Sequence, residues 1–195
     1  TVDGSISISC PADQTVNLDQ NCQFALEDYT NDPQTVVNSP CAPLQSVVQR
    51  PLAGTIITSS TLVTLIATDQ AGNVDSCNFT VNPVDVSPPV ITCPADQTVA
   101  TDANCLGQVP NFTAMASATD NCDGSNVSIT QVSPIAGSFI TANSIVTLRA
   151  TDTQGNSSEC TFNLTLVDET GPVVSCPMDV TVGLDSNCEA LLDDY

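Results

Sequence analysis

The sequence contains no histidine, no lysine and no tryptophan, and these absences exclude several classes of chemistry. Without histidine or lysine there is no serine–histidine or cysteine–histidine catalysis and no Schiff-base lysine. Paired carboxylates of the glycosidase kind stay formally open, but a repeated unit without a large insertion offers no obvious cleft for them. We therefore expect no enzymatic activity and assign no catalytic residue.

Basic residues are nearly absent as well. Arg50 and Arg149 are the only two, against 22 acidic residues, and the formal net charge is −20. Nucleic acid and anionic lipid would be repelled by such a chain. Charged residues make up only 12% of the sequence, so the surface must be built mainly from Ser, Thr, Asn and Gln. This composition favours a covering of glycans or of neighbouring copies of the protein.

Long apolar runs are missing too, since none approaches the roughly 20 residues of a membrane span, and we expect no direct membrane insertion.

Cysteine, by contrast, is abundant, with ten residues. The absence of histidine and of any CxxC pair excludes the common zinc patterns. Ten cysteines then indicate disulfides and an extracellular or cell-surface location.

One heptapeptide sets the organisation of the chain. CPADQTV stands at residues 10–16 and again at 93–99, and it returns as CPMDVTV at 176–182. Both offsets are 83 residues, and a fixed period of this size indicates one folded unit that is repeated. The predicted units are residues 1–85, 86–168 and, with its first strands only, 169–195.

The third unit is expected to be incomplete. The partners of Cys176 and Cys188 would lie beyond Tyr195, so the 195 residues are interpreted as a window on a longer array. Tyr29, Phe112 and Tyr195 each follow the second cysteine of their unit by seven residues. This position is predicted to lie in a strand.

Within a unit the apolar residues recur with a period of two. The alternation covers residues 63–68 and 77–81, with copies at 146–151 and 160–165. Such a pattern predicts strands with one buried face. Further strands are predicted at residues 90–93, 106–112, 127–132 and 139–141.

Turns and joints complete the predicted architecture. Gly72 and Gly155 can supply the positive φ of hairpin turns between the alternating segments. Frequent turns and the absence of a helical stripe predict an all-β fold of β-sandwich units. Pro83, Pro88 and Pro89 at the joint restrict the backbone, so the units should form a semi-rigid, head-to-tail rod.

At this point the residues resemble a known family, the hyalin repeat or HYR domain. The resemblance rests on VDVSPPVITCPADQTV at 84–99, DNC at 120–122, IVTLRATDTQGN at 145–156 and CTFNLTLVD at 160–168. The first copy departs from the family at its start and in lacking DN before Cys41. The resemblance implies tandem immunoglobulin-like sandwiches in extracellular and cell-surface proteins with adhesive or structural roles, and it brings no catalytic residues.

Four cysteines in each complete unit allow three pairings, and the sequence does not decide among them. If the first strand lies parallel beside the last, as the immunoglobulin-like resemblance implies, the first and fourth cysteines are adjacent and the other two are left for each other. The pairs expected on this arrangement are Cys10–Cys77, Cys22–Cys41, Cys93–Cys160 and Cys105–Cys122.

No resident metal or other cofactor is predicted. Four carboxylates are nevertheless of the kind that calcium binds, although EF-hand spacing and cadherin-type joint motifs are absent; they are Asp85, Asp168, Asp120 and Asp123. Asp69 and Asp152 are instead expected to cap their hairpins through side-chain hydrogen bonds to the backbone.

Five sequons for N-glycosylation occur, although sequons also arise by chance in a chain rich in Asn, Ser and Thr. They are at Asn78, Asn111, Asn126, Asn156 and Asn163. Asn78 and Asn163 alternate with buried positions, so their side chains are expected to face solvent, and glycans are expected on the protein.

Two functions are compatible with these patterns. The first is a structural segment of a glycosylated extracellular filament or cell-surface stalk, whose partners are other copies of the same repeat. The alternative is an adhesive module that recognises a receptor or polysaccharide through the loops at 41–50 and 122–126. The scarcity of aromatic residues, 4% of the chain, favours the filament.

Overall fold

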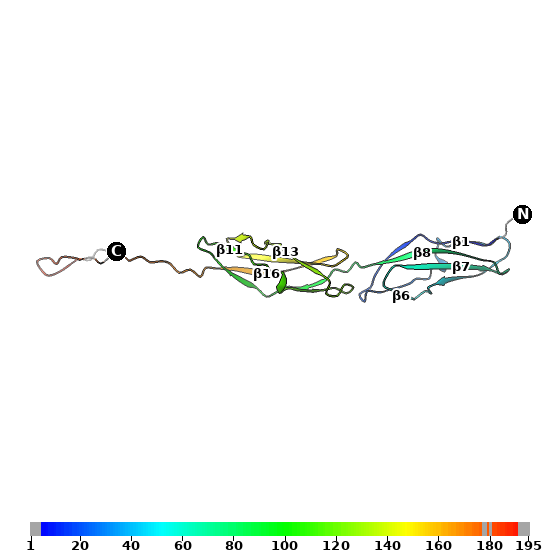
Figure 1. Cartoon of the computed structure of the whole chain (residues 1–195), viewed down its shortest axis with the longest axis horizontal. Helices are drawn as coiled ribbons and strands as arrows, with labels where there is room; N and C mark the ends of the chain where they lie inside the picture. Colours follow the sequence, from blue (N-terminus) through cyan, green and yellow to red (C-terminus); the bar gives the residue numbers. More distant parts are fainter. Residues whose placement is uncertain (1–4, 177–178, 180, 191–195) are drawn as a thin grey trace.

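A computed structural model describes residues 5–176, 179 and 181–190 of the chain. It is an all-β protein in which two similar units follow each other along one long axis (Figure 1). The first unit contains β1 (Ser7–Ser9), β2 (Gln14–Asn17), β3 (Phe24–Ala25), β4 (Val36–Asn38), β5 (Leu44–Arg50), β6 (Ile56–Ile57), β7 (Thr61–Asp69) and β8 (Val74–Val84). The second contains β9 (Val90–Thr92), β10 (Gln97–Ala100), β11 (Gly107–Gln108), β12 (Ser117–Thr119), β13 (Ser128–Ser133), β14 (Phe139–Ile140), β15 (Ser144–Thr151) and β16 (Ser157–Val167).

The two units have the same strand order. In the first unit a four-stranded sheet runs β2-β8-β7-β5, and the pairs β1-β4 and β3-β6 complete the sandwich. The second unit repeats this with β10-β16-β15-β13 and the pairs β9-β12 and β11-β14. β2 runs parallel to β8, and β10 runs parallel to β16. The head-to-tail sandwiches predicted from the 83-residue period are therefore present.

The repeated heptapeptide is the segment where the chain changes sheets. β1 pairs with β4, but β2, which contains the QTV of the motif, pairs with β8 of the other sheet. Between the two strands, the Asp13 carboxylate accepts a hydrogen bond of 2.7 Å from the backbone N–H of Thr80. Asp96 accepts the equivalent bond, 2.8 Å, from Asn163. The motif thus caps an edge amide that the parallel strand would otherwise leave unpaired.

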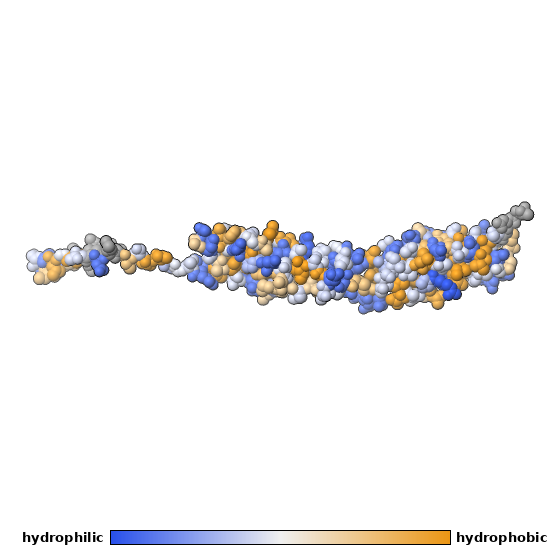
Figure 2. Space-filling view, viewed as in Figure 1, coloured by the Kyte–Doolittle hydropathy of each residue, from blue (hydrophilic) through white to orange (hydrophobic). Residues whose placement is uncertain are grey.

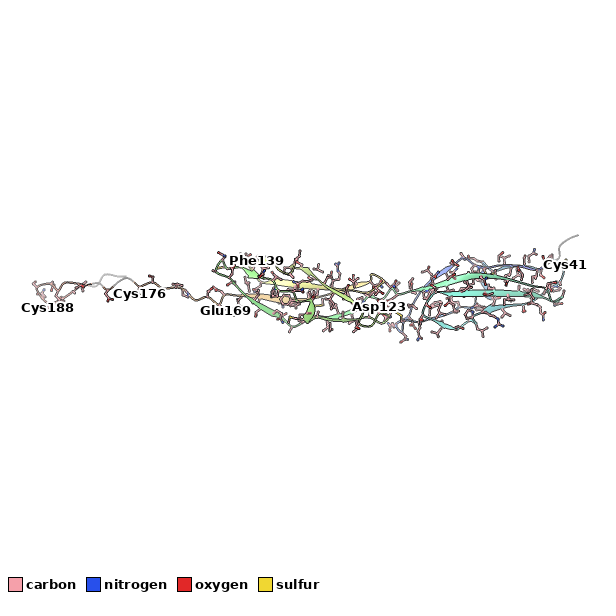
Figure 3. The ribbon with its side chains drawn as sticks, viewed as in Figure 1. Cys41, Asp123, Phe139, Glu169, Cys176 and Cys188 are labelled. Carbon is pink, nitrogen blue, oxygen red and sulfur yellow. A yellow bond between two sulfur atoms is a disulfide. The ribbon has the colours of Figure 1, made fainter. Side chains whose placement is uncertain are left out.

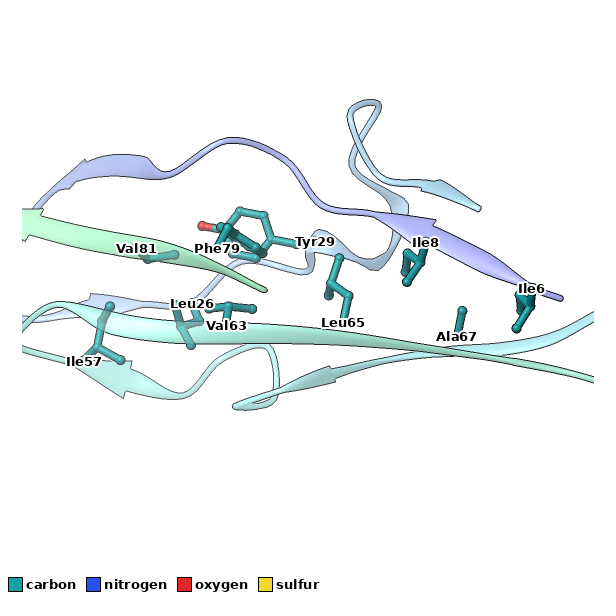
Figure 4. Packing of buried hydrophobic residues seen from close by; sticks show 10 residues of the cluster. All are labelled: Ile6, Ile8, Leu26, Tyr29, Ile57, Val63, Leu65, Ala67, Phe79 and Val81. Atoms are coloured by element: carbon teal, nitrogen blue, oxygen red, sulfur yellow. The ribbon is translucent and has the colours of Figure 1, made fainter. Parts of the chain in front are cut away.

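The core of each unit comes from the alternation in the sequence. In β7 every second residue from Val63 onwards is buried, because successive side chains of a strand point to opposite faces. One edge-to-face aromatic pair stands in each core: Tyr29 on Phe79 with ring centroids 4.9 Å apart, and Phe112 on Phe162 at 5.1 Å. Figure 4 shows the first of these cores between the two layers.

The surface carries no dense apolar face in the view of Figure 2, where hydrophobic and hydrophilic residues are interspersed along both units. Some exposed apolar side chains recur at equivalent positions. Leu62 and Ile145, 83 residues apart, are both well exposed on the first part of their strands. Among the described residues, none forms a helix long and apolar enough to cross a membrane.

Two details of the predicted strands are wrong. The segment 106–112 is a strand only at β11, and the residues after it turn away from the sheet. Contrary to the prediction, Tyr29 and Phe112 are also not in strands. Tyr29 begins the 3-10 turn η1 (Tyr29–Asn31), and Phe112 directly precedes the 3-10 turn η2 (Thr113–Met115). A buried glutamine explains the turn, because the Gln49 side chain accepts from the Tyr29 N–H at 2.8 Å. Gln131 does the same for Phe112 at 2.9 Å.

The partial third unit shows no strand among the residues of it that the structure describes. In the complete units the second strand pairs with the last strand of its own unit, and no strand follows β16 in the part of the chain that the structure describes. Tyr195 lies outside the described residues. One local feature of the unit is nevertheless formed: Asp185 accepts hydrogen bonds from the N–H groups of Asn187 and Glu189, and Cys188 has a φ of 63°.

The hairpin caps make a prediction for the first unit. The Asp69 carboxylate accepts hydrogen bonds from the Asn73 side chain at 2.8 Å and from the N–H groups of Asn73 and Ala71, both at 2.9 Å. These bonds, the Asn73 side chain first, hold the pKa of Asp69 below its ordinary value. A depressed pKa contributes stability that is present above the pKa of the unfolded chain, about 3.9 for Asp, and is lost as the pH falls below it.

We therefore expect the urea midpoint of the first unit to fall between pH 6 and pH 3. Asp69→Asn should be less stable than the wild type at pH 6, and its midpoint should change less between the two pH values. Urea unfolding followed by the near-UV signal of Tyr29 measures both. An equal pH dependence in the variant would contradict this role of Asp69.

Candidate functional site at the joint between the units

The joint is short and well packed. β8 ends at Val84 and β9 begins at Val90, so only residues 85–89 connect the two sandwiches. Pro89 is fully buried, and its carbonyl accepts a hydrogen bond from the Ser158 hydroxyl on β16. The linker is thus fixed to the second unit rather than left as a free hinge.

On the side of the first unit, a turn after β2 presents Cys22 to the joint. The N–H of Leu18 donates to the carbonyl of Val84, which places the turn at the end of β8. Asp19 then accepts hydrogen bonds from the backbone N–H groups of Asn21 at 2.8 Å and Gln23 at 2.9 Å. Cys22 itself has a φ of 59°, in the left-handed region that non-glycine residues seldom occupy.

On the side of the second unit, the DNCDG loop folds around Asp120. Its carboxylate accepts hydrogen bonds from the N–H groups of Cys122 at 2.7 Å and Asp123 at 3.0 Å. The backbones of Asp120 and Gly124 exchange two more, at 2.8 and 3.0 Å. Asp123 extends the loop to the neighbouring hairpin by accepting from the N–H of Thr153 at 2.8 Å.

A disulfide between Cys22 and Cys122 joins these two turns across the units, with the Cα atoms 5.1 Å apart. The side-chain amide of Asn121 also donates to the carbonyl of Asp19 at 3.3 Å. The expected pairs Cys22–Cys41 and Cys105–Cys122 are therefore wrong. Cys22 and Cys122 do form a disulfide, but each pairs with a cysteine of the other unit.

Strand direction explains the correction. Cys22 follows β2 and lies at the carboxyl end of β8, whereas Cys41 precedes β5, whose start pairs with the end of β7 beside the 69–73 hairpin. β8 has 11 residues, so the two cysteines are separated by roughly 30 Å at 3.3 Å per residue. A disulfide needs Cα atoms within about 7 Å. Figure 3 shows Cys41 at the far end of the first unit, away from Asp123 at the joint.

The other two predicted disulfides are present in the structure. Cys10 is bonded to Cys77 with the Cα atoms 5.6 Å apart, and Cys93 is bonded to Cys160 at 5.8 Å. Each connects the segment before the parallel strand to the last strand of the same unit. The four remaining cysteines are exposed and unpaired in this chain: Cys41, Cys105, Cys176 and Cys188.

A cluster of carboxylates lies beside the joint disulfide. Oxygen atoms of Asp120, Asp123 and Asp152 lie within 4.8 Å of one another, and those of Asp85 and Asp120 lie within the same limit. Three of the predicted calcium candidates, Asp85, Asp120 and Asp123, are thus brought together. The fourth, Asp168, is exposed after β16 and accepts hydrogen bonds from Thr170 instead.

The sequence assigned Asp152 only to its hairpin, and it does hold that turn. It accepts hydrogen bonds from the N–H groups of Gln154 at 3.0 Å and Asn156 at 2.7 Å, and from the Asn156 side chain at 2.8 Å. Although burial opposes ionisation, these bonds keep the pKa of Asp152 below its ordinary value. The Asn156 amide also donates to the carbonyl of Asp85 at 3.1 Å, so the hairpin cap is part of the joint.

The sequons differ in how free their side-chain amides are. Asn78, Asn111 and Asn126 are exposed, and no hydrogen bond from their amide nitrogens occurs in the described structure. Asn163 is also exposed, so both asparagines expected to face solvent do so, but its amide donates to Asp96 at 2.9 Å. Asn156 is half-buried and engaged at the joint. A glycan on Asn156 would displace these contacts.

The fold and the joint define a class of protein: tandem β-sandwich modules that are disulfide-linked both within and between units. Residues 84–166 match the family model described as HYR domain. This segment is a HYR domain, which confirms for residues 84–166 the family resemblance identified from the sequence. The first unit lies outside the match but has the same strand order.

Relatives of known name support this assignment. The chain is 32% identical over 155 residues to hyalin from Lytechinus variegatus, covering 76% of this chain and 29% of that protein. It is 30% identical over 178 residues to hyalin from Strongylocentrotus purpuratus, covering 86% of this chain and 14% of that protein. The chain therefore spans less than a third of these relatives.

Cadherin segments are among the solved structures that align with the chain. The protocadherin GammaB4 extracellular domain aligns with a TM-score of 0.40 and 16% identity, over 86% of this chain and 33% of that one. Drosophila N-cadherin EC1-4 aligns with a TM-score of 0.38 and 12% identity, over 84% and 49%.

Proposed function

We propose that this chain is a structural repeat segment of an extracellular filament or cell-surface stalk in which consecutive HYR units are cross-linked at every joint. The observation that carries the proposal is the Cys22–Cys122 disulfide. A disulfide within one unit would stabilise that unit alone. A disulfide between units instead limits how far neighbouring sandwiches can bend or separate, which is a mechanical property of an array.

The unpaired cysteines extend the proposal beyond the joint described here. Cys105 has the same φ of 59° as Cys22, and Asp102 accepts from the N–H groups of Asn104 and Leu106 as Asp19 does in the first unit. The N–H of Thr101 donates to the carbonyl of Val167, which places the turn at the end of β16. Cys105 is therefore presented as Cys22 is, and we propose that it bonds the third cysteine of a following unit.

Cys41 completes the same scheme at the opposite end. It is the third cysteine of the first unit, as Cys122 is of the second, and it is exposed. Its proposed partner is the second cysteine of a preceding unit. The units on either side can belong to the same chain or to other copies of it, so the partners are further repeats of the same type.

Glycans complete the proposed surface. The three sequons with free, exposed amides, at Asn78, Asn111 and Asn126, are the proposed attachment sites. A hydroxyl-rich surface with few charges is compatible with such a cover. Non-catalytic HYR units with this surface suit a load-bearing role outside the cell.

The alternative adhesive function has less free loop available than the sequence suggests. Most of the segment at 41–50 is strand β5, paired with β7. In the loop at 122–126, Cys122 is bonded to Cys22, and residues 124–126 are exposed. Because only short parts of the two segments are free to contact a receptor or polysaccharide, we favour the filament.

Electron microscopy of the native material tests the proposal. We expect an axial repeat of one unit, density that connects Cys105 to the third cysteine of the next unit, and glycan density at Asn78, Asn111 or Asn126. Peptide mapping without reduction should recover Cys105 in a disulfide with a cysteine from another unit. Isolated, globular particles with Cys105 as a free thiol would overturn it.

A further inference from the structure

We propose that the joint carboxylates form a calcium site centred on Asp120. The cluster consists of Asp85 from the linker, Asp120 and Asp123 from the DNCDG loop, and Asp152 from the hairpin between β15 and β16. The site lies at a joint within a single chain, so its presence is independent of the proposed filament.

The main argument is that two buried carboxylate oxygens have no partner. Asp85 and Asp120 are each only 8% exposed. One oxygen of each accepts backbone N–H groups, but the other, Oδ2, is buried without any hydrogen bond. A buried carboxylate oxygen without a donor is costly, and buried polar atoms in native proteins are nearly always paired. These two oxygens are therefore the atoms with which the joint can bind a cation.

Distances agree with a large cation beside Asp120, the residue common to both groups of carboxylates. Two oxygens on opposite sides of a calcium ion lie about 4.6–5.2 Å apart, because each is 2.3–2.6 Å from the metal. The ligand oxygens of Asp120, Asp123 and Asp152 all lie within 4.8 Å of one another, and Asp85 meets the same limit with Asp120. Cys122 also lies within this distance but its sulfur is held in the disulfide, so the available donors are carboxylate oxygens, which hard cations prefer.

Among the residues that the structure describes, neither Arg50 nor Arg149 forms an ion pair with the cluster. The chain has two basic side chains, and in the described structure Arg149 forms an ion pair with Glu159, at 2.6 Å, rather than with the cluster. Four carboxylates at one joint repel one another strongly when partly buried. A divalent cation would remove this repulsion and would also tie the linker, the loop and the hairpin together.

The equivalent positions of the first unit provide an internal comparison. Asp69 corresponds to Asp152 and caps its hairpin with the same set of hydrogen bonds. However, Ser39 and Ala42 stand where the second unit has Asp120 and Asp123. The first unit therefore has the hairpin cap without the cluster, which makes Asp69→Asn a matched control for Asp152→Asn.

Calorimetric titration of the oxidised 195-residue chain with calcium chloride, after removal of metal by chelator, tests the site. We expect saturable binding, and the melting temperature of the second unit should rise by roughly 10–20 °C in calcium at 100 times Kd relative to excess EDTA. Asp120→Asn should weaken binding roughly tenfold or more, since calcium affinity depends on the number of charged ligands. Magnesium at the same concentration should bind more weakly, because it requires a tighter octahedral site.

Controls separate the site from general effects of charge. Asp152→Asn should weaken binding while Asp69→Asn, with the same loss of a hairpin cap, should not. Asp168→Asn, an exposed candidate outside the cluster, should leave affinity unchanged. If Asp120→Asn does not fold, Asp123→Asn serves as the second test. Equal melting temperatures in calcium and EDTA, or unchanged affinity in the cluster variants, would overturn the proposal.

Discussion

Replacing Cys22 and Cys122 together by serine is expected to uncouple the two units. When the second unit unfolds beside a folded first unit, the disulfide closes a loop from the linker to Cys122 of close to 40 residues. The chain-entropy relation gives about 4 kcal/mol for a loop of this length. The double variant should therefore lose about 4 kcal/mol of unfolding free energy in the second unit, whose transition should move to lower urea while that of the first unit stays in place.

The measurement is urea unfolding of the oxidised protein, together with small-angle X-ray scattering of the native state. Scattering should show a broader distribution of interatomic distances within the variant chain, because the joint then depends on residues 85–89 and their packing alone. The double substitution is preferable to either single one since it leaves no new free thiol at the joint.

Cys41→Ser is the matched control for this experiment. It makes the same chemical change at an exposed cysteine that has no partner in this chain. Surface substitutions of this kind change stability by less than about 0.5 kcal/mol. If the double variant unfolds in one step with the wild-type midpoint, the disulfide does not couple the units.

The sequence predicted what repeats within a unit and failed where two units meet. Alternation in β7 and β8 and the 83-residue period are local patterns, so strands and turns follow from them. The first-to-last disulfide Cys10–Cys77 follows from the parallel first and last strands that the family resemblance implies. The Cys22–Cys122 bond depends instead on how one sandwich is placed on the next. A repeat pattern contains no such information, because it is the same for every placement of the units.

Part of the correction follows from strand direction alone. Once the strand containing Thr15 and Val16 is taken as parallel to the last strand, Cys22 must lie at that strand's carboxyl end. Cys41 precedes a strand antiparallel to the 63–68 segment and must lie at the opposite end. Strand direction, followed through each cysteine, is therefore enough to exclude the Cys22–Cys41 pair.

The carboxylate cluster, too, could be predicted from the sequence only in part. Asp120 and Asp123 are neighbours in the sequence, and Asp85 is recognisable there as a joint residue. Asp152 is correctly assigned to its hairpin, but its place in the cluster depends on the hairpin packing over the linker through Asn156 and Asp85. A residue with one satisfied local role gives no sequence signal for a second role across the joint.

Truncating Phe162 to alanine is the second large expected effect. The ring is 6% exposed and packs edge to face on Phe112, with the centroids 5.1 Å apart and the planes at 85°. Removal of a buried phenylalanine side chain costs about 3–5 kcal/mol, because both the burial and the filled volume are lost. For a module of this size such a loss is a large part of the total stability, so the second unit should be mostly unfolded at 37 °C once the joint disulfide is also removed.

Phe139→Ala is the control, since the same side chain is removed from the same unit at a position 58% exposed on β14. The unfolding free energy of this variant should change by less than about 1 kcal/mol, because an exposed side chain loses little burial.

Far-UV circular dichroism in urea follows both units, and the near-UV signal of Tyr29, buried in the first core, reports that unit separately. Phe162→Ala should shift the far-UV transition of the second unit and leave the near-UV transition of the first unit in place. A shift of both transitions by the same amount would mean that the two sandwiches unfold as one body, and the joint would then contribute more to stability than the disulfide alone.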